Sequence, residues 1–238
     1  MLNNLLLQMT VGNSVKSVPV ETIIPEEKTL TLWQLASSGG IGGAIIMTTL
    51  LILSIIAVYI IIERFLAIKK ASKEDANFMN QIKDFIIDGK MDAAKSICKS
   101  NDSPIAKMIE KGISRIGKPL SDIGTAVETT GKLELNKLEK NLSTLATISG
   151  AAPMIGFLGT VIGMILVFHK MATGGGGVDL QTLSDGIFTA MVTTVAGLIV
   201  GIIAYVGYNT LVARVEKIVF IMEARTTEFL DILHEPAV

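Results

Sequence analysis

Three long stretches of this chain contain no Asp, Glu, Lys or Arg, and they constrain its fold more than any other feature. They are residues 29–62, 141–169 and 186–213. A helix needs about 20 apolar residues to cross a bilayer, and each stretch is longer than that. Half of the 238 residues are apolar, a share that a soluble domain could also have. The positions of the charge-free stretches, not the overall composition, therefore separate a membrane protein from a soluble one. The chain is predicted to be an all-α integral membrane protein with three transmembrane helices.

Basic residues are distributed unevenly around these stretches, and this asymmetry predicts an orientation. Of the 21 Lys and Arg residues, only Lys16, Lys28 and Lys170 lie on one side of a three-span arrangement. Cytoplasmic flanks carry the excess of Lys and Arg. The N-terminus is therefore predicted to be periplasmic and the C-terminus cytoplasmic.

Together, the spans and the orientation divide the chain into seven predicted segments. They are an N-terminal periplasmic arm (1–40), transmembrane helix one (41–63), a cytoplasmic helical domain (64–142), transmembrane helix two (143–168), a periplasmic loop (169–185), transmembrane helix three (186–211) and a cytoplasmic C-terminal helix (212–238).

The predicted cytoplasmic domain has the apolar spacing of short helices. Helical spacing begins at Phe78 and stops at Gly89, resumes at Met91, and resumes again after Ser103-Pro104. From Ser121 the pattern predicts one long helix that runs without interruption into the second span. These features favour a small helical module over a disordered segment.

The third span is predicted to continue into the cytoplasm as the same helix. Apolar positions there recur at alternating intervals of three and four residues: Val212, Val215, Val219, Met222, Thr226, Phe229 and Leu233. Such a seam is typical of a helix that packs on a neighbour.

Small residues and hydroxyls recur within the second and third spans. The small residues and the proline that we expect at helix-packing positions are Pro153, Gly156, Gly159, Gly163, Gly197 and Gly201. The candidate pore-lining hydroxyls are Thr160, Thr189, Thr193 and Thr194. Small residues let helix backbones approach closely, and a hydroxyl in hydrocarbon needs a partner on another helix or in water. The two helices are therefore predicted to pack together and to line a path.

Nothing in the sequence predicts an enzyme. The single cysteine, Cys98, has no histidine near it, and no metal-ligand spacing, nucleophile–base pair or phosphate-binding loop is present. We expect no cofactor, no metal and no nucleic-acid partner. The basic residues after the first span make membrane lipids a secondary partner.

The spans also carry motifs that resemble a known family. The run from Ala152 to Met164 resembles the second-span signature of ExbB and TolQ proteins. The third span is similar to theirs in Gly186-Ile187, Thr194, Ala196-Gly197-Leu198 and Tyr208-Asn209, and Glu63-Arg64-Phe65 resembles their membrane-exit motif.

This resemblance implies a proton-driven motor, with ExbB as the nearer relative. Five copies would form a ring in the inner membrane of a Gram-negative bacterium, and spans two and three would line its pore. A single-span ExbD-like partner with one membrane aspartate would sit inside, and a TonB-like protein would carry the work to the outer membrane. The family's pore-facing threonines correspond to Thr160 and Thr194.

The chain departs from the family pattern at one position. Many members carry a glutamate five residues before the threonine that corresponds to Thr194, and this chain has Thr189 there. Apart from Glu63 at the end of the first span, tyrosine is the only ionisable residue type in the three predicted spans. The titrating carboxylate is therefore expected to come from the partner.

Several alternatives stay open at this point. The chain could serve a TolQ-like or gliding-type motor, and the coupling ion could be H⁺ or Na⁺. In a different class, it could be a passive membrane scaffold or transporter accessory subunit. Its threonines would then bond their own backbone carbonyls, as threonines in membrane helices often do.

Overall fold

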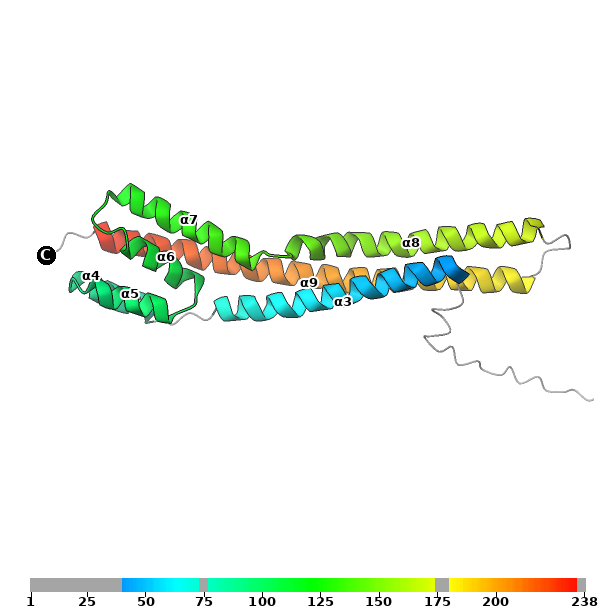
Figure 1. Ribbon diagram of the computed structural model, residues 1–238, viewed down its shortest axis with the longest axis horizontal. Coiled ribbons are helices and arrows are strands. Elements are labelled where there is room, and N and C mark those ends of the chain that lie inside the picture. Colours follow the sequence, from blue (N-terminus) through cyan, green and yellow to red (C-terminus); the bar gives the residue numbers. More distant parts are fainter. Residues whose placement is uncertain (1–39, 73–76, 174–179, 235–238) are drawn as a thin grey trace, which may run out of the picture. The chain divides into compact units, whose positions relative to one another are not determined.

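The computed structural model describes residues 40–72, 77–173 and 180–234, and this part of the chain is helical with turns and contains no strand. The helices are α3 (Gly40–Ala71), α4 (Phe78–Ile87), α5 (Met91–Ser100), α6 (Pro104–Ile113), α7 (Leu120–Leu138), α8 (Leu142–Thr173) and α9 (Leu180–His234) (Figure 1). The predicted all-α class is confirmed. Nearly all of the predicted N-terminal arm, and residues 174–179 of the predicted periplasmic loop, lie outside the described residues.

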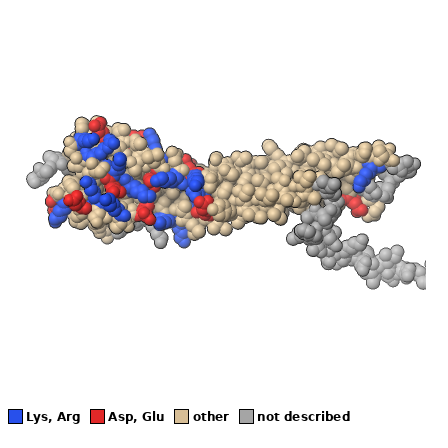
Figure 2. Space-filling view, in the orientation of Figure 1, with Lys and Arg blue, Asp and Glu red and all other residues tan. Residues whose placement is uncertain are grey.

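Three helices hold the charge-free stretches. α3, α8 and α9 are each long and apolar enough to cross a membrane. α8 and α9 pack along each other, and α3 lies against both of them (Figure 1). Figure 2 shows an almost uncharged surface over these spans and dense Lys, Arg, Asp and Glu over the end formed by α4–α7. The side of the membrane that each end faces stays a prediction.

The longest helix, α9, confirms that the third span continues beyond the membrane segment. It has 55 residues without interruption. Val215, Met222 and Phe229 of the predicted seam are buried, and the alternate seam positions are half-buried. The seam packs on α6 and α7 of the same chain.

The prediction of one continuous helix from Ser121 into the second span is wrong. α7 ends at Leu138 and α8 begins at Leu142, and between them Asn141 has a φ of 64°. This left-handed conformation stops a helix, and Asn adopts it more readily than other residues with a side chain. The apolar spacing of three and four residues continues across the break, so periodicity alone could not reveal it.

The short helices predicted near Phe78, at Met91 and after Ser103 are confirmed. Gly89 has a φ of 70° and ends the first of them, as expected of a residue without a Cβ. The Ser103 hydroxyl accepts a hydrogen bond from the backbone N–H of Ala106 at 3.2 Å, which caps α6. Cys98 is buried in the core of this module, and the burial raises the pKa of its thiol to about 12. The lone cysteine is therefore an inert core residue.

Candidate ion-path site

The α8–α9 interface brings two backbones into direct contact. A Cβ placed on Gly197 would lie 2.6 Å from the carbonyl oxygen of Ala152 and 2.8 Å from the Cα of Gly156. A Cβ on Gly156 would lie 2.8 Å from the carbonyl oxygen of Thr193. Both distances are too short for a real side chain, and the obstructing atoms are backbone. Glycine at these positions is what permits the close approach.

The other predicted packing residues lie at the same interface. A Cβ on Gly201 would lie 2.5 Å from Cγ of Pro153, and one on Gly163 would lie 2.9 Å from Cβ of Ala190. Pro153 has no N–H to donate to the carbonyl of Ser149 within α8. That carbonyl oxygen is 3.2 Å from the position of a Gly201 Cβ, so α9 covers this part of α8 closely. Packing of these residues around a separate partner stays a prediction.

Two threonine hydroxyls of α9 reach the same carbonyl of α8. Thr193 is buried, and its Oγ1 donates to the carbonyl of Ala190 at 2.7 Å and lies 3.3 Å from the carbonyl oxygen of Gly156. Oγ1 of half-buried Thr194 donates to Gly156 at 3.1 Å. A Cβ on Gly159 would lie 2.3 Å from Oγ1 of Thr193, so this glycine makes room for that side chain. These are the inter-helix hydroxyl partners that hydrocarbon favours.

Thr160 and Thr189 are not joined to this cluster. Oγ1 of Thr160 donates to the carbonyl of Phe157 at 2.6 Å, and Oγ1 of Thr189 donates to the carbonyl of Asp185 at 2.9 Å. Both residues are half-buried and bond their own helix. This is the arrangement that the scaffold alternative predicts for an individual threonine. It also leaves each hydroxyl oxygen able to accept a further hydrogen bond.

Large apolar side chains cover the outer faces of α8 and α9. Met154 is 73 % exposed and Phe157 is 63 % exposed. The other strongly exposed apolar residues of the two spans include Ile165, Phe168, Met191, Val195, Ile199, Ile202 and Val206. A soluble protein rarely exposes so much apolar surface. These faces fit lipid or neighbouring protein helices.

Within 143–168 and 186–211, the described parts of α8 and α9 that form the predicted spans, there is no Asp, Glu, Lys, Arg or His. The residues described hold no group of three His, Cys, Asp or Glu side chains that could bind a metal ion. In the second and third predicted spans, which form this interface, Tyr205 and Tyr208 are the only ionisable residues. The interface offers hydroxyls and carbonyls, which can hydrogen-bond to an acid but cannot themselves titrate near neutral pH.

A set of ion pairs and hydrogen bonds, which we call the polar junction, lies where the apolar spans meet the α4–α7 module. Arg64 of α3 is 7 % exposed, forms an ion pair with Glu63, and donates from Nη1 to the carbonyl of Lys137 at 2.9 Å. Helix α7 ends one residue later, so this carbonyl has lost its partner within the helix. The Arg214 guanidinium of α9 lies 4.3 Å from the centre of the Phe65 ring. The Glu63-Arg64-Phe65 motif therefore ties α3 to α7 and α9.

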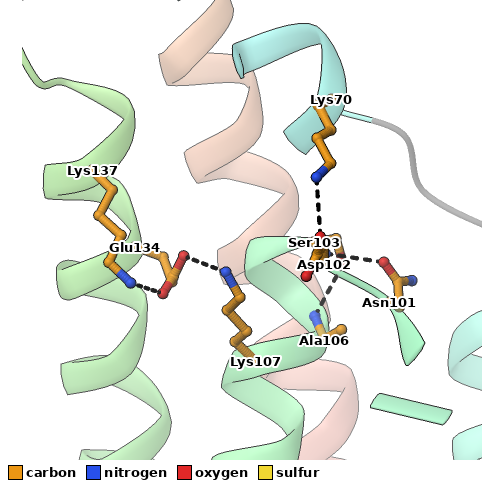
Figure 3. Close-up of polar contacts among 8 residues, drawn as sticks. All are labelled: Lys70, Asn101, Asp102, Ser103, Ala106, Lys107, Glu134 and Lys137. Atoms are coloured by element: carbon orange, nitrogen blue, oxygen red, sulfur yellow. Dashed lines mark hydrogen bonds and ion pairs between the residues drawn. The ribbon is translucent and has the colours of Figure 1, made fainter. Parts of the chain in front are cut away.

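The junction continues through a nearly buried carboxylate. The side chain of Glu134 is 9 % exposed and contacts Lys107 at 3.3 Å and Lys137 at 2.5 Å (Figure 3). Burial acts to raise the pKa of Glu134, but the hydrogen bonds and charges of the two lysines outweigh it and hold the pKa below its ordinary value. A separate pair joins Lys70 of α3 to Asp102 at 3.0 Å (Figure 3). Nothing in the spacing of these charges along the sequence predicts that Glu134 is buried.

Comparison with known proteins decides the family. Residues 100–224 match the MotA/TolQ/ExbB proton channel family. The chain belongs to this family. The match covers α6, α7, α8 and most of α9, and so includes the whole α8–α9 interface. Family membership, expected from the motifs, is confirmed.

Individual relatives bear both ExbB and TolQ names. The chain is 26 % identical over 215 residues to the Tol-Pal system protein TolQ of Pseudomonas aeruginosa, covering 86 % of this chain and 93 % of that one. It is 39 % identical over 77 residues to the biopolymer transport protein ExbB of Helicobacter pylori, covering 32 % of this chain and 52 % of that one. A putative ExbB homologue of Methanothermobacter thermautotrophicus is 30 % identical over 128 residues, covering 54 % of this chain and 44 % of that one. The chain thus spans about half the length of these two ExbB relatives.

Proposed function

We propose that this member of the MotA/TolQ/ExbB proton channel family is an ExbB-like stator subunit of a proton-driven inner-membrane motor. It would work with an ExbD-like partner that carries a membrane aspartate, and would energise TonB-dependent transport across the outer membrane. The observation that carries the proposal is that the membrane segments of α8 and α9 (143–168 and 186–211) are closely packed, bear hydroxyls and contain no Asp, Glu, Lys, Arg or His.

The mechanism places the protonation cycle on the partner. A carboxyl group in the membrane favours its neutral form, because desolvation penalises the charge. The oxygen of Thr160 can accept a hydrogen bond from the protonated acid. After the acid loses its proton, the same hydroxyl can leave the carbonyl of Phe157 and donate to the carboxylate. Each proton that crosses contributes about 2.3 kcal/mol per 100 mV of membrane potential.

The proposed assembly is a homopentameric ring with periplasmic N-termini and cytoplasmic C-termini, in the inner membrane of a Gram-negative bacterium. The positive-inside distribution of Lys and Arg supports this orientation. The exposed apolar faces of α8 and α9 support a location among lipids and neighbouring helices.

A TolQ-like role is the second candidate, and one observation favours it. The alignment with the Pseudomonas TolQ covers 93 % of that protein, whereas the alignments with the two ExbB relatives cover about half of theirs. Deletion of the gene separates the two roles. Loss of energised uptake supports the ExbB-like role, and chained cells with a leaking outer membrane support the TolQ-like role.

The threonines test the motor proposal against a passive scaffold. The chain is co-expressed with its ExbD-like partner, and proton leak is measured in vesicles with an internal pH dye. Thr160→Val and Thr194→Val are expected to lower the leak at least tenfold. The matched control is Thr48→Val in α3, where the hydroxyl donates only to the carbonyl of Ala44. Unchanged leak and unchanged uptake in both test variants would support a scaffold instead.

A further inference from the structure

Several large apolar side chains are exposed in the charged module, outside the apolar spans, and two of the most exposed lie on the α7–α9 pair. Phe220 of α9 is 72 % exposed and Leu133 of α7 is 57 % exposed. Exposed charged residues surround them, among them Glu216 and Lys217 beside Phe220 and Lys132 and Lys137 beside Leu133. This part of the chain therefore faces water, and these two side chains present apolar surface there.

The two side chains lie at the same level along the α7–α9 pair. The two helices run antiparallel, since a Cβ placed on Gly131 would lie 3.6 Å from Cε of Met222 and one placed on Gly124 would lie 3.7 Å from Cδ1 of Leu230. Leu133 follows Gly131 by two residues, and Phe220 precedes Met222 by two residues. Both are therefore displaced by about 3 Å in the same direction from that contact.

These side chains cannot meet within one chain. A shift of two residues turns a side chain by about 200° around its helix. Leu133 and Phe220 therefore point away from the faces through which Gly131 and Met222 meet. Each is therefore available to a partner outside its own chain.

We propose that Phe220 of one copy packs on Leu133 of the next copy around the ring. The inference rests on the proposed ring. In a closed ring, neighbouring copies are related by rotation about the ring axis. If that axis is parallel to α9, the rotation does not shift a residue along it, so a head-to-tail contact between neighbours must join residues at the same height along α9. Residues 133 and 220 on different helices meet this requirement.

Charges next to the two side chains are complementary in the same register. Glu216 lies one turn before Phe220, and Lys137 lies one turn after Leu133. Because α7 and α9 are antiparallel, both are displaced by about 6 Å in the same direction and are again level. Glu216 and Lys137 are exposed and opposite in sign, and Lys137 also pairs with Glu134 of its own chain. The pair fixes the register of the contact rather than its strength.

Cysteine cross-linking of the full chain in native membranes tests this contact. The variant carrying both Leu133→Cys and Phe220→Cys is treated with a mild oxidant and separated without reductant. The matched control carries Asp122→Cys and Phe220→Cys. Asp122 is exposed on the same face of α7 but about 16 Å further along the helix, beyond the reach of a disulfide. The unmodified chain, whose only cysteine is the buried Cys98, is the blank.

We expect a ladder of dimers and higher species from the variant with Leu133→Cys and Phe220→Cys. The control variant and each single variant are expected to remain monomeric on the gel. Dimers from Phe220→Cys alone would overturn the contact, because they indicate a two-fold interface. If native mass spectrometry shows a multimer but the variant with Leu133→Cys and Phe220→Cys gives no ladder, the contact is overturned and the ring is kept. A monomeric native mass would overturn both. A full ladder with no partner-dependent proton leak would refute the proposed function alone.

Discussion

At the scale of single residues, the structure distinguishes glycines that are required from glycines that are tolerated. Gly197 lies against backbone atoms of α8, whereas a Cβ on Gly150 would have no atom within 4 Å. The sequence shows both as small residues in an apolar stretch. Only the relative placement of two helices separates them.

Gly197→Ala is expected to destabilise the protein by about 1–3 kcal/mol, because a methyl group must displace the α8 backbone. Thermal unfolding in detergent, followed by circular dichroism, measures the effect. Gly150→Ala is the control and is expected to be neutral or stabilising, since Ala favours the helix and the space is open. Equal effects of the two changes would contradict the close α8–α9 approach.

The polar junction leads to a pH prediction. The pKa of Glu134 is lowered in the folded state, so its contribution to stability is present above the ordinary value of 4.5 and is lost as the pH falls through the folded pKa. Glu134→Gln is expected to lower stability at pH 7 by about 1–3 kcal/mol. The difference from the unmodified chain shrinks below pH 4.5.

Thermal unfolding at pH 7 and pH 4 checks this prediction. Glu128→Gln, which removes an exposed carboxylate paired with Lys132, is the control and is expected to change little. A constant effect of Glu134→Gln across this pH range would contradict the assigned role of the charge.

At the scale of elements, helical periodicity predicted the spans, the short helices and the continuation of α9. It failed at the α7–α8 break, because the apolar spacing continues through Asn141 while the backbone there is left-handed. It also failed to indicate that Arg64 would satisfy the Lys137 carbonyl at the end of α7. The hydrogen bond joins segments more than 70 residues apart in the sequence, which periodicity within one segment cannot reveal.

Substitutions at Asn141 test the break. Asn141→Gly is expected to preserve stability, since glycine adopts positive φ without strain. Asn141→Val is expected to cost at least about 1–2 kcal/mol, because its branched side chain opposes a φ of 64°. Thermal unfolding of both variants is the measurement. A stabilising effect of Val would indicate a continuous helix in place of the break.

At the scale of the whole molecule, family membership and three apolar spans were accessible from the sequence. The candidate pore-lining site could be predicted from the sequence only in part. The sequence identified Thr193 and Thr194, but not that both hydroxyls reach the Gly156 carbonyl. Nor did it show that Thr160 and Thr189 bond their own helices. A threonine looks the same in the sequence whether its hydroxyl bonds its own helix or a neighbouring helix. Only the side chains and backbone around it in the structure distinguish the two cases.

The central claim is that this chain supplies a path with no titrating acid, while the partner supplies the carboxylate. Proton leak into vesicles tests it most directly, with the chain alone, with its ExbD-like partner, and with a partner whose membrane aspartate is changed to asparagine. Leak is predicted only with the intact partner. Equal leak from the chain alone, or with the asparagine partner, would contradict the claim.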